Sequence, residues 1–115
     1  MPSTYLILGQ SAPAAGVLTT LYTTPAATST VVSSIIACNT SVGTPDYIRI
    51  SIAQAGAADT AAQYIYGGNV GKGFLIQPLD TFVANLGTTL ATTDLIRVYS
   101  QNGTTSFNLS GVQLT

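Results

Sequence analysis

The chain has 115 residues, of which only three are Lys or Arg and four are Asp, with no Glu, no His and no Trp. Soluble domains usually carry charge on about a quarter of their residues, whereas this chain is 6% charged and 46% hydrophobic. The hydrophobic content excludes simple disorder. So few charges predict that much of the surface is covered by other protein.

The positive charges are too few and too scattered to attract a polyanion. Nucleic-acid binding and docking on an anionic membrane both need clustered Lys and Arg, so we expect neither partner. The opening residues 1–9 contain no basic residue before a short apolar run, unlike a secretory signal, and no stretch reaches the ~20 apolar residues of a membrane span. We therefore expect a chain that folds in the cytoplasm as one domain, residues 1–115.

The local pattern is that of strands, because Thr, Val, Ile, Tyr and Phe dominate runs that are broken by Gly, Pro, Asn and Asp. The predicted fold class is all-β: a single antiparallel β-sandwich or jelly-roll-like domain of about eight short strands. In chain order, the predicted strands cover residues 4–8, 16–23, 29–38, 46–54, 62–66, 73–77, 80–86, 94–100 and 104–114.

Residues 1–15 form a candidate N-terminal arm that lies on a neighbouring subunit, since chain ends are poorly ordered unless something holds them. Tyr5 and Leu6 are the contact residues we predict within it. The strand at 29–38 is apolar on both faces, which predicts one cover from the core and another from a loop or a neighbouring subunit. Cys38, the only cysteine, is interpreted as a small buried hydrophobic residue.

The strand at 46–54 alternates clearly. Ile48, Ile50 and Ile52 point into the core, and Tyr47 and Arg49 point the other way. Arg97 and Tyr99 repeat the pairing of an arginine with a tyrosine two residues away. Arg and Tyr are enriched at protein interfaces, so the predicted contact residues are Tyr47, Arg49, Arg97 and Tyr99, to which we add Lys72. The alternative is that both arginines are ordinary solvated side chains.

Two later segments carry specific expectations. Tyr64 and Tyr66 are expected to share one strand face, either as core residues or as part of a sugar site beside the Gly-rich loop 67–73. That loop differs from a phosphate-binding loop because Gly73, and not Ser or Thr, follows the lysine. In the last strand the apolar residues change parity at Ser110-Gly111, which predicts a bulge at Gly111.

The chain offers little for catalysis, since a Ser or Cys nucleophile needs a base and there is no His. We predict no enzyme activity, no catalytic residue, no cofactor and no metal ligand, and we interpret Asp46, Asp59, Asp80 and Asp94 as turn-capping residues. A hydrolase that uses an Asp pair and a weak Ca²⁺ site of loop carbonyls with one Asp are the chemical alternatives left open.

Four segments, GVLTTLYTTP (16–25), VVSSIIACN (31–39), DLIRVY (94–99) and FNLSGV (107–112), resemble small virion proteins of tailed phages. The chain is similar to the β-sandwich capsid decoration, or cement, proteins of such phages, those of cyanophages among them. The resemblance implies a trimer that braces a capsid shell, and it transfers no functional residue.

The sequence therefore favours a non-enzymatic structural virion protein. We expect it on the outside of a phage capsid, where it clamps adjacent subunits of the major capsid protein, and we expect its partners to be that protein and further copies of itself. The alternative function is a receptor- or glycan-binding module of a tail fibre or baseplate.

Overall fold

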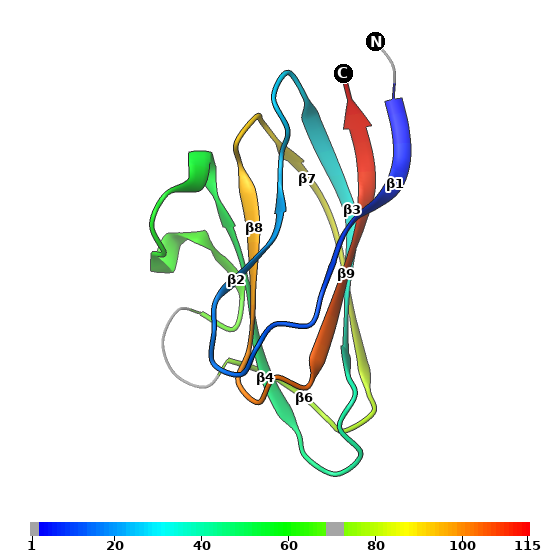
Figure 1. The fold of residues 1–115 in the computed structure, drawn as a ribbon, viewed down its shortest axis with the longest axis vertical. Helices are drawn as coiled ribbons and strands as arrows, with labels where there is room; N and C mark the ends of the chain where they lie inside the picture. The colour runs from blue at the N-terminus through cyan, green and yellow to red at the C-terminus, as the bar shows by residue number, and fades with distance from the viewer. Residues whose placement is uncertain (1–2, 69–72) are drawn as a thin grey trace.

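The computed structural model describes residues 3–68 and 73–115, and this part of the chain forms two antiparallel sheets packed face to face (Figure 1). Sheet A has the strand order β1-β9-β3-β7, and sheet B has the order β2-β8-β4-β5, with β6 also paired to β4. The strands are β1 (Ser3–Ser11), β2 (Thr19–Thr23), β3 (Ser29–Asn39), β4 (Asp46–Ala53), β5 (Tyr64–Tyr66), β6 (Phe74–Ile76), β7 (Thr81–Leu90), β8 (Leu95–Ser100) and β9 (Thr105–Leu114).

The strands pair in a nested order that defines the topology. The first strand β1 pairs with the last strand β9, β2 pairs with β8, and β3 pairs with β7. At the centre of the nest, β5 and β6 lie along one edge of β4 like a single interrupted strand. This arrangement is one long hairpin rolled into two sheets, which is the jelly roll. The predicted all-β sandwich is confirmed, and each predicted strand has an observed counterpart.

The core lies between the sheets and follows from the alternation of side chains along each strand. Ile48 and Ile50 of β4 are fully buried, as predicted, and they face Ile35 of β3 and Phe107 and Leu109 of β9 in one hydrophobic cluster. Two short 3-10 helices, η1 (Gln54–Gly56) and η2 (Ala61–Gln63), lie beside sheet B (Figure 1).

A buried carboxylate holds one end of the sandwich together. Asp46, at the start of β4, has no exposed surface. Its Oδ1 accepts hydrogen bonds from the backbone N–H groups of Tyr47 and Asn102, both at 2.9 Å, and its Oδ2 accepts from the hydroxyls of Ser100 and Thr105, the latter at 2.5 Å. These donors include the end of β8, the turn after it and the start of β9. Asp46 therefore fixes the β8–β9 turn to β4, which goes well beyond the local turn-capping predicted for it.

A buried amide extends this network to the other loops at the same end. The side chain of Asn39, also fully buried, donates to the carbonyl oxygens of Thr44 (3.0 Å) and Ile76 (3.2 Å). Its carbonyl oxygen accepts from the Ser41 N–H and from the Thr104 hydroxyl. The β3–β4, β6–β7 and β8–β9 connections are thus joined through one residue.

Replacing Asp46 by Ala should destabilise the fold by roughly 3–5 kcal/mol, because four donors would lose their acceptor and some would remain buried without one. Urea unfolding followed by circular dichroism measures this change. The matched control is Asp80→Ala: Asp80 is exposed and accepts a hydrogen bond from the Thr81 N–H, so its loss should cost about 1 kcal/mol or less. Equal losses for the two variants would contradict the central role of Asp46.

The parity change in β9 has a different origin from the predicted bulge at Gly111. Strand β9 is regular, and Gly111 continues the buried parity of Phe107 and Leu109. The register shifts lie on its two neighbours, between Ile7 and Gly9 in β1 and between Val32 and Ser34 in β3. A Cβ atom on Gly111 would overlap the carbonyl oxygen of Val31, so the absence of a side chain allows β3 to pass this close.

Gly111→Ala should therefore destabilise the protein by about 3 kcal/mol or more, since the added methyl group meets rigid backbone. Gly43→Ala is the control, because a Cβ atom at Gly43 has open space around it. Thermal and urea unfolding of the two variants should separate them clearly, and a fully stable Gly111→Ala protein would show that β3 can move away.

Candidate protein-interaction surfaces

The outer face of sheet B gathers four of the predicted contact residues. We call the surface formed by Tyr47, Arg49, Arg97 and Tyr99 the Arg–Tyr face. Arg49 of β4 lies directly opposite Tyr99 of β8 in the strand register, and its guanidinium carbon is 4.4 Å from the centre of the tyrosine ring. This geometry is a cation–π contact, which fixes the planar head of Arg49 at the surface of the sheet.

Arg97 and Tyr47 extend the face in two directions. Arg97 is paired with Ser51 of β4 and Thr20 of β2, and its Nη1 makes a long hydrogen bond of 3.5 Å to Oε1 of Gln63. Tyr47 lies opposite the exposed Leu75 of β6. The face therefore combines two cations with aromatic rings, all half-buried, in the outward positions that the alternation predicted.

The expectation that Tyr64 and Tyr66 share a strand face is wrong. Tyr66 pairs with Ile50, Tyr64 pairs with Ser51, and the register shifts between the two pairs because β5 contains the additional residue Ile65. Tyr66 consequently turns inward and packs against the core, with its ring centre 4.8 Å from that of Phe82. Tyr64 remains on the outer side, so the two rings cannot form a joint sugar platform.

Tyr64 borders the Arg–Tyr face, and its surroundings raise the pKa of its phenol. Burial, followed by the hydrogen bond and the negative charge of Asp59, raises the pKa of Tyr64 from 10.0 to about 12, and the nearby Arg49 charge opposes the rise. The phenol is thus held in its neutral, donating form against the Asp59 carboxylate.

We expect an ultraviolet titration to show one tyrosine that ionises near pH 12, and Tyr64→Phe should remove that component. Because the folded pKa lies above the ordinary value of 10.0, the contribution of Tyr64 to stability is complete below pH 10 and is lost as the pH rises toward 12. Asp59→Asn should move the transition toward 10.0, whereas Asp80→Asn should leave it in place.

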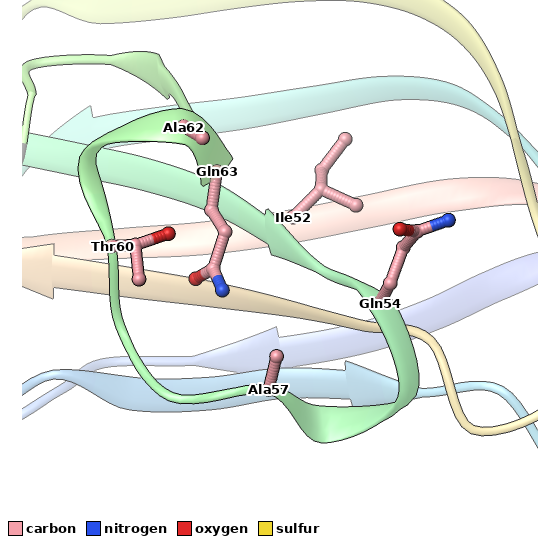
Figure 2. A pocket seen from close by; sticks show the side chains of 6 residues that line it. All are labelled: Ile52, Gln54, Ala57, Thr60, Ala62 and Gln63. Atoms are coloured by element: carbon pink, nitrogen blue, oxygen red, sulfur yellow. The ribbon is translucent and has the colours of Figure 1, made fainter.

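An open hollow of about 400 Å³ lies beside this face, between the end of β4 and the two 3-10 helices (Figure 2). Its polar lining groups are the amides of Gln54 and Gln63 and the hydroxyl of Thr60, and Ile52, Ala57 and Ala62 complete the wall. These groups can exchange hydrogen bonds with a neutral polar ligand. None of the six lining residues carries a charge, so the hollow itself supplies neither an acid–base pair nor a metal site.

The outer face of sheet A has the opposite character, and we call it the uncharged face. Directly paired residues form three rows across β1, β9, β3 and β7: Tyr5, Val112, Val31 and Thr89; Ile7, Ser110, Ser34 and Asn85; and Gln10, Asn108, Ile36 and Val83. No residue in these rows is charged. Several apolar side chains on this face are open to solvent: Tyr5 is 82% exposed, Ile7 62%, Val83 52% and Ile36 37%.

The remaining predicted contact residues are divided between several places. Tyr5 lies on the uncharged face, whereas Leu6 pairs with Gly111 and lies on the inner side of β1. Lys72 lies outside the described residues. The segment predicted as an arm forms the edge strand β1 of the molecule's own sheet A over Ser3–Ser11, and its contact with a neighbour stays a prediction.

Cys38 is half-buried on the outer side of β3 and not in the core, because Ala37 and Asn39 take the inward positions.

The other carboxylates are bonded to backbone or phenol groups. Asp94 accepts hydrogen bonds from the N–H groups of Ala55 and Ala91, and Asp80 accepts from that of Thr81, as turn-capping residues do. No group of three potential metal ligands occurs within residues 3–68 and 73–115. None of the helical segments in this described part has the length and apolar character that crossing a bilayer requires.

Comparison with known proteins adds no assignment to this geometry. No model of a known protein family matches the chain, and no curated protein matches it significantly.

Proposed function

We propose that this chain is a non-enzymatic structural protein of a phage virion, which decorates the outside of the capsid and clamps adjacent subunits of the major capsid protein. The proposal follows the resemblance of four sequence segments to capsid decoration proteins. The jelly roll is compatible with it, since that fold occurs in viral capsid domains and also in lectins, but a fold alone does not assign a function.

The observation that carries the proposal is the Arg–Tyr face. Two of the three cations of the chain lie on one sheet face together with Tyr47 and Tyr99, and Arg49 is stacked on Tyr99. Arg and Tyr in such a setting are the side chains that contribute most to protein interfaces. Because the planar head of an arginine can bind a carboxylate through two hydrogen bonds, the partner surface that fits this face is acidic.

The rest of the composition fits a protein whose surface is buried against other proteins when it functions. A surface of Thr, Ser, Ala and Gly can be buried without removing many charges from water, and charge burial is the expensive term in association. Small contacts repeated over the symmetric copies of a shell would then add up to useful stability.

The second candidate function, a glycan- or receptor-binding module, is favoured by the hollow lined by Gln54, Thr60 and Gln63. Amides and hydroxyls recognise sugar hydroxyl groups, and Tyr64 lies next to Gln63 in the chain. The aromatic platform expected from Tyr64 and Tyr66 together is lost, because only Tyr64 faces outward.

Capsids that lack the protein provide the test. Purified chain added to such capsids should bind at a copy number comparable to that of the major capsid protein. Arg97→Gln should weaken binding by about tenfold, because it removes an interfacial charge and keeps a side chain able to bond to Gln63. Binding of the native chain should also fall as salt rises.

Thr89→Val, on the opposite sheet, is the matched control and should bind capsids normally. A copy number far below that of the capsid protein, together with binding to host cells, would overturn the decoration role in favour of the glycan-binding module. Unchanged binding of Arg97→Gln would remove the Arg–Tyr face as the contact.

A further inference from the structure

We propose that the uncharged face of sheet A is a self-association surface, which packs against the same face of a second copy of this chain across a two-fold axis. This inference goes beyond the capsid role and does not depend on it, since it concerns the isolated protein. It differs from the trimer that the resemblance implies, and the mass of the purified chain distinguishes the two.

Residues 3–68 and 73–115 leave this face uncovered. Tyr5, Ile7 and Val83 expose more than half of their surface, and the two 3-10 helices lie on the side of sheet B (Figure 1). The exposed apolar side chains form two groups, Tyr5 with Ile7 on β1 and Val83 with its paired neighbour Ile36, and Ser110, Ser34 and Asn85 lie between the groups. Exposed apolar groups on one face of a soluble domain mark a site of association. Strand β3, apolar on both of its faces, thus has the core on one side and no cover from the described chain on the other.

Four of its polar side chains are already bonded to one another in pairs. Ser34 and Ser110 share a hydrogen bond of 3.1 Å between their hydroxyls, and Gln10 donates to Asn108 at 2.5 Å. Burial of a polar group is costly when it loses water without gaining a partner. Because these pairs keep their hydrogen bonds, removing water from the face costs less free energy than its composition suggests.

The absence of charge from this face favours a second copy of the chain as the partner that covers it. A two-fold interface brings the same patch together twice, so every charged group near the axis would meet its own copy. The uncharged face has no such group in its three rows. On the Arg–Tyr face, by contrast, Arg49 and Arg97 of one copy would meet those of the other, and like charges in an interface cost affinity.

The size of the face is also sufficient. Four strands about 4.8 Å apart and about ten residues long, at about 3.3 Å per residue, have a footprint of about 600 Å². Two copies would bury about 1,200 Å², the lower limit of stable interfaces. Sheets that pack in this way lie about 10 Å apart with their strands within about 30° of alignment, a gap that Tyr5, Ile36 and Val83 can fill.

Light scattering and sedimentation of the purified full-length chain test the proposal. The expected mass is twice the 11.8 kDa of one chain. Val83→Asp should raise the dissociation constant at least about tenfold, because it places a like charge on each copy. The matched control is Val42→Asp in the β3–β4 loop, where Val42 is 84% exposed and away from the face; it should remain dimeric.

Asn85→Asp is a second probe, which adds a charge to the face without changing the side-chain volume. Circular dichroism shows whether each variant is folded, so that lost association can be distinguished from lost folding. A monomeric or trimeric native chain would overturn the two-fold pair, and so would folded Val83→Asp and Asn85→Asp proteins that remain as dimeric as the control. A monomeric Val83→Asp chain that still binds capsids would support this inference separately from the proposed function.

Discussion

The structure depends on the hydrogen-bonded carboxylate of Asp46. A buried ion is costly unless its lone pairs are satisfied, and here two N–H groups and two hydroxyls satisfy them. The same bonds hold the β8–β9 turn against β4, and Asn39 ties in the loops on either side. Sheets A and B are therefore fixed to each other at this end by polar groups, while the hydrophobic core fixes them along their length.

This fixed frame separates two surfaces of opposite chemistry. The outer side of sheet B carries Arg49 and Arg97 with their neighbouring tyrosines, and the outer side of sheet A carries apolar and neutral polar side chains. The two proposals assign an unlike, acidic partner to the charged, aromatic face and a second copy of the chain to the neutral face. On these proposals, the placement of a few charges determines which partner each face binds.

The strands and the outward positions of Tyr47, Arg49, Arg97 and Tyr99 could be predicted because they depend on alternation within single strands. What escaped prediction depends on pairing between strands. The additional residue Ile65 separates Tyr64 from Tyr66, and the shifts beside Gly111 lie on its neighbours. Asp46 looked like an ordinary turn residue next to Pro45, since its partners Asn102 and Thr105 are far away in the sequence.

The nested pairing also has a consequence for the order of folding. Ser3 pairs with Leu114, so the contact between β1 and β9 closes a loop that spans almost the whole chain. Contacts between such distant segments form slowly, because the loop entropy is lost before the contact is made. During synthesis β1 emerges long before β9, the strand with which it pairs, so the apolar residues of β1 lack this partner until β9 has been made.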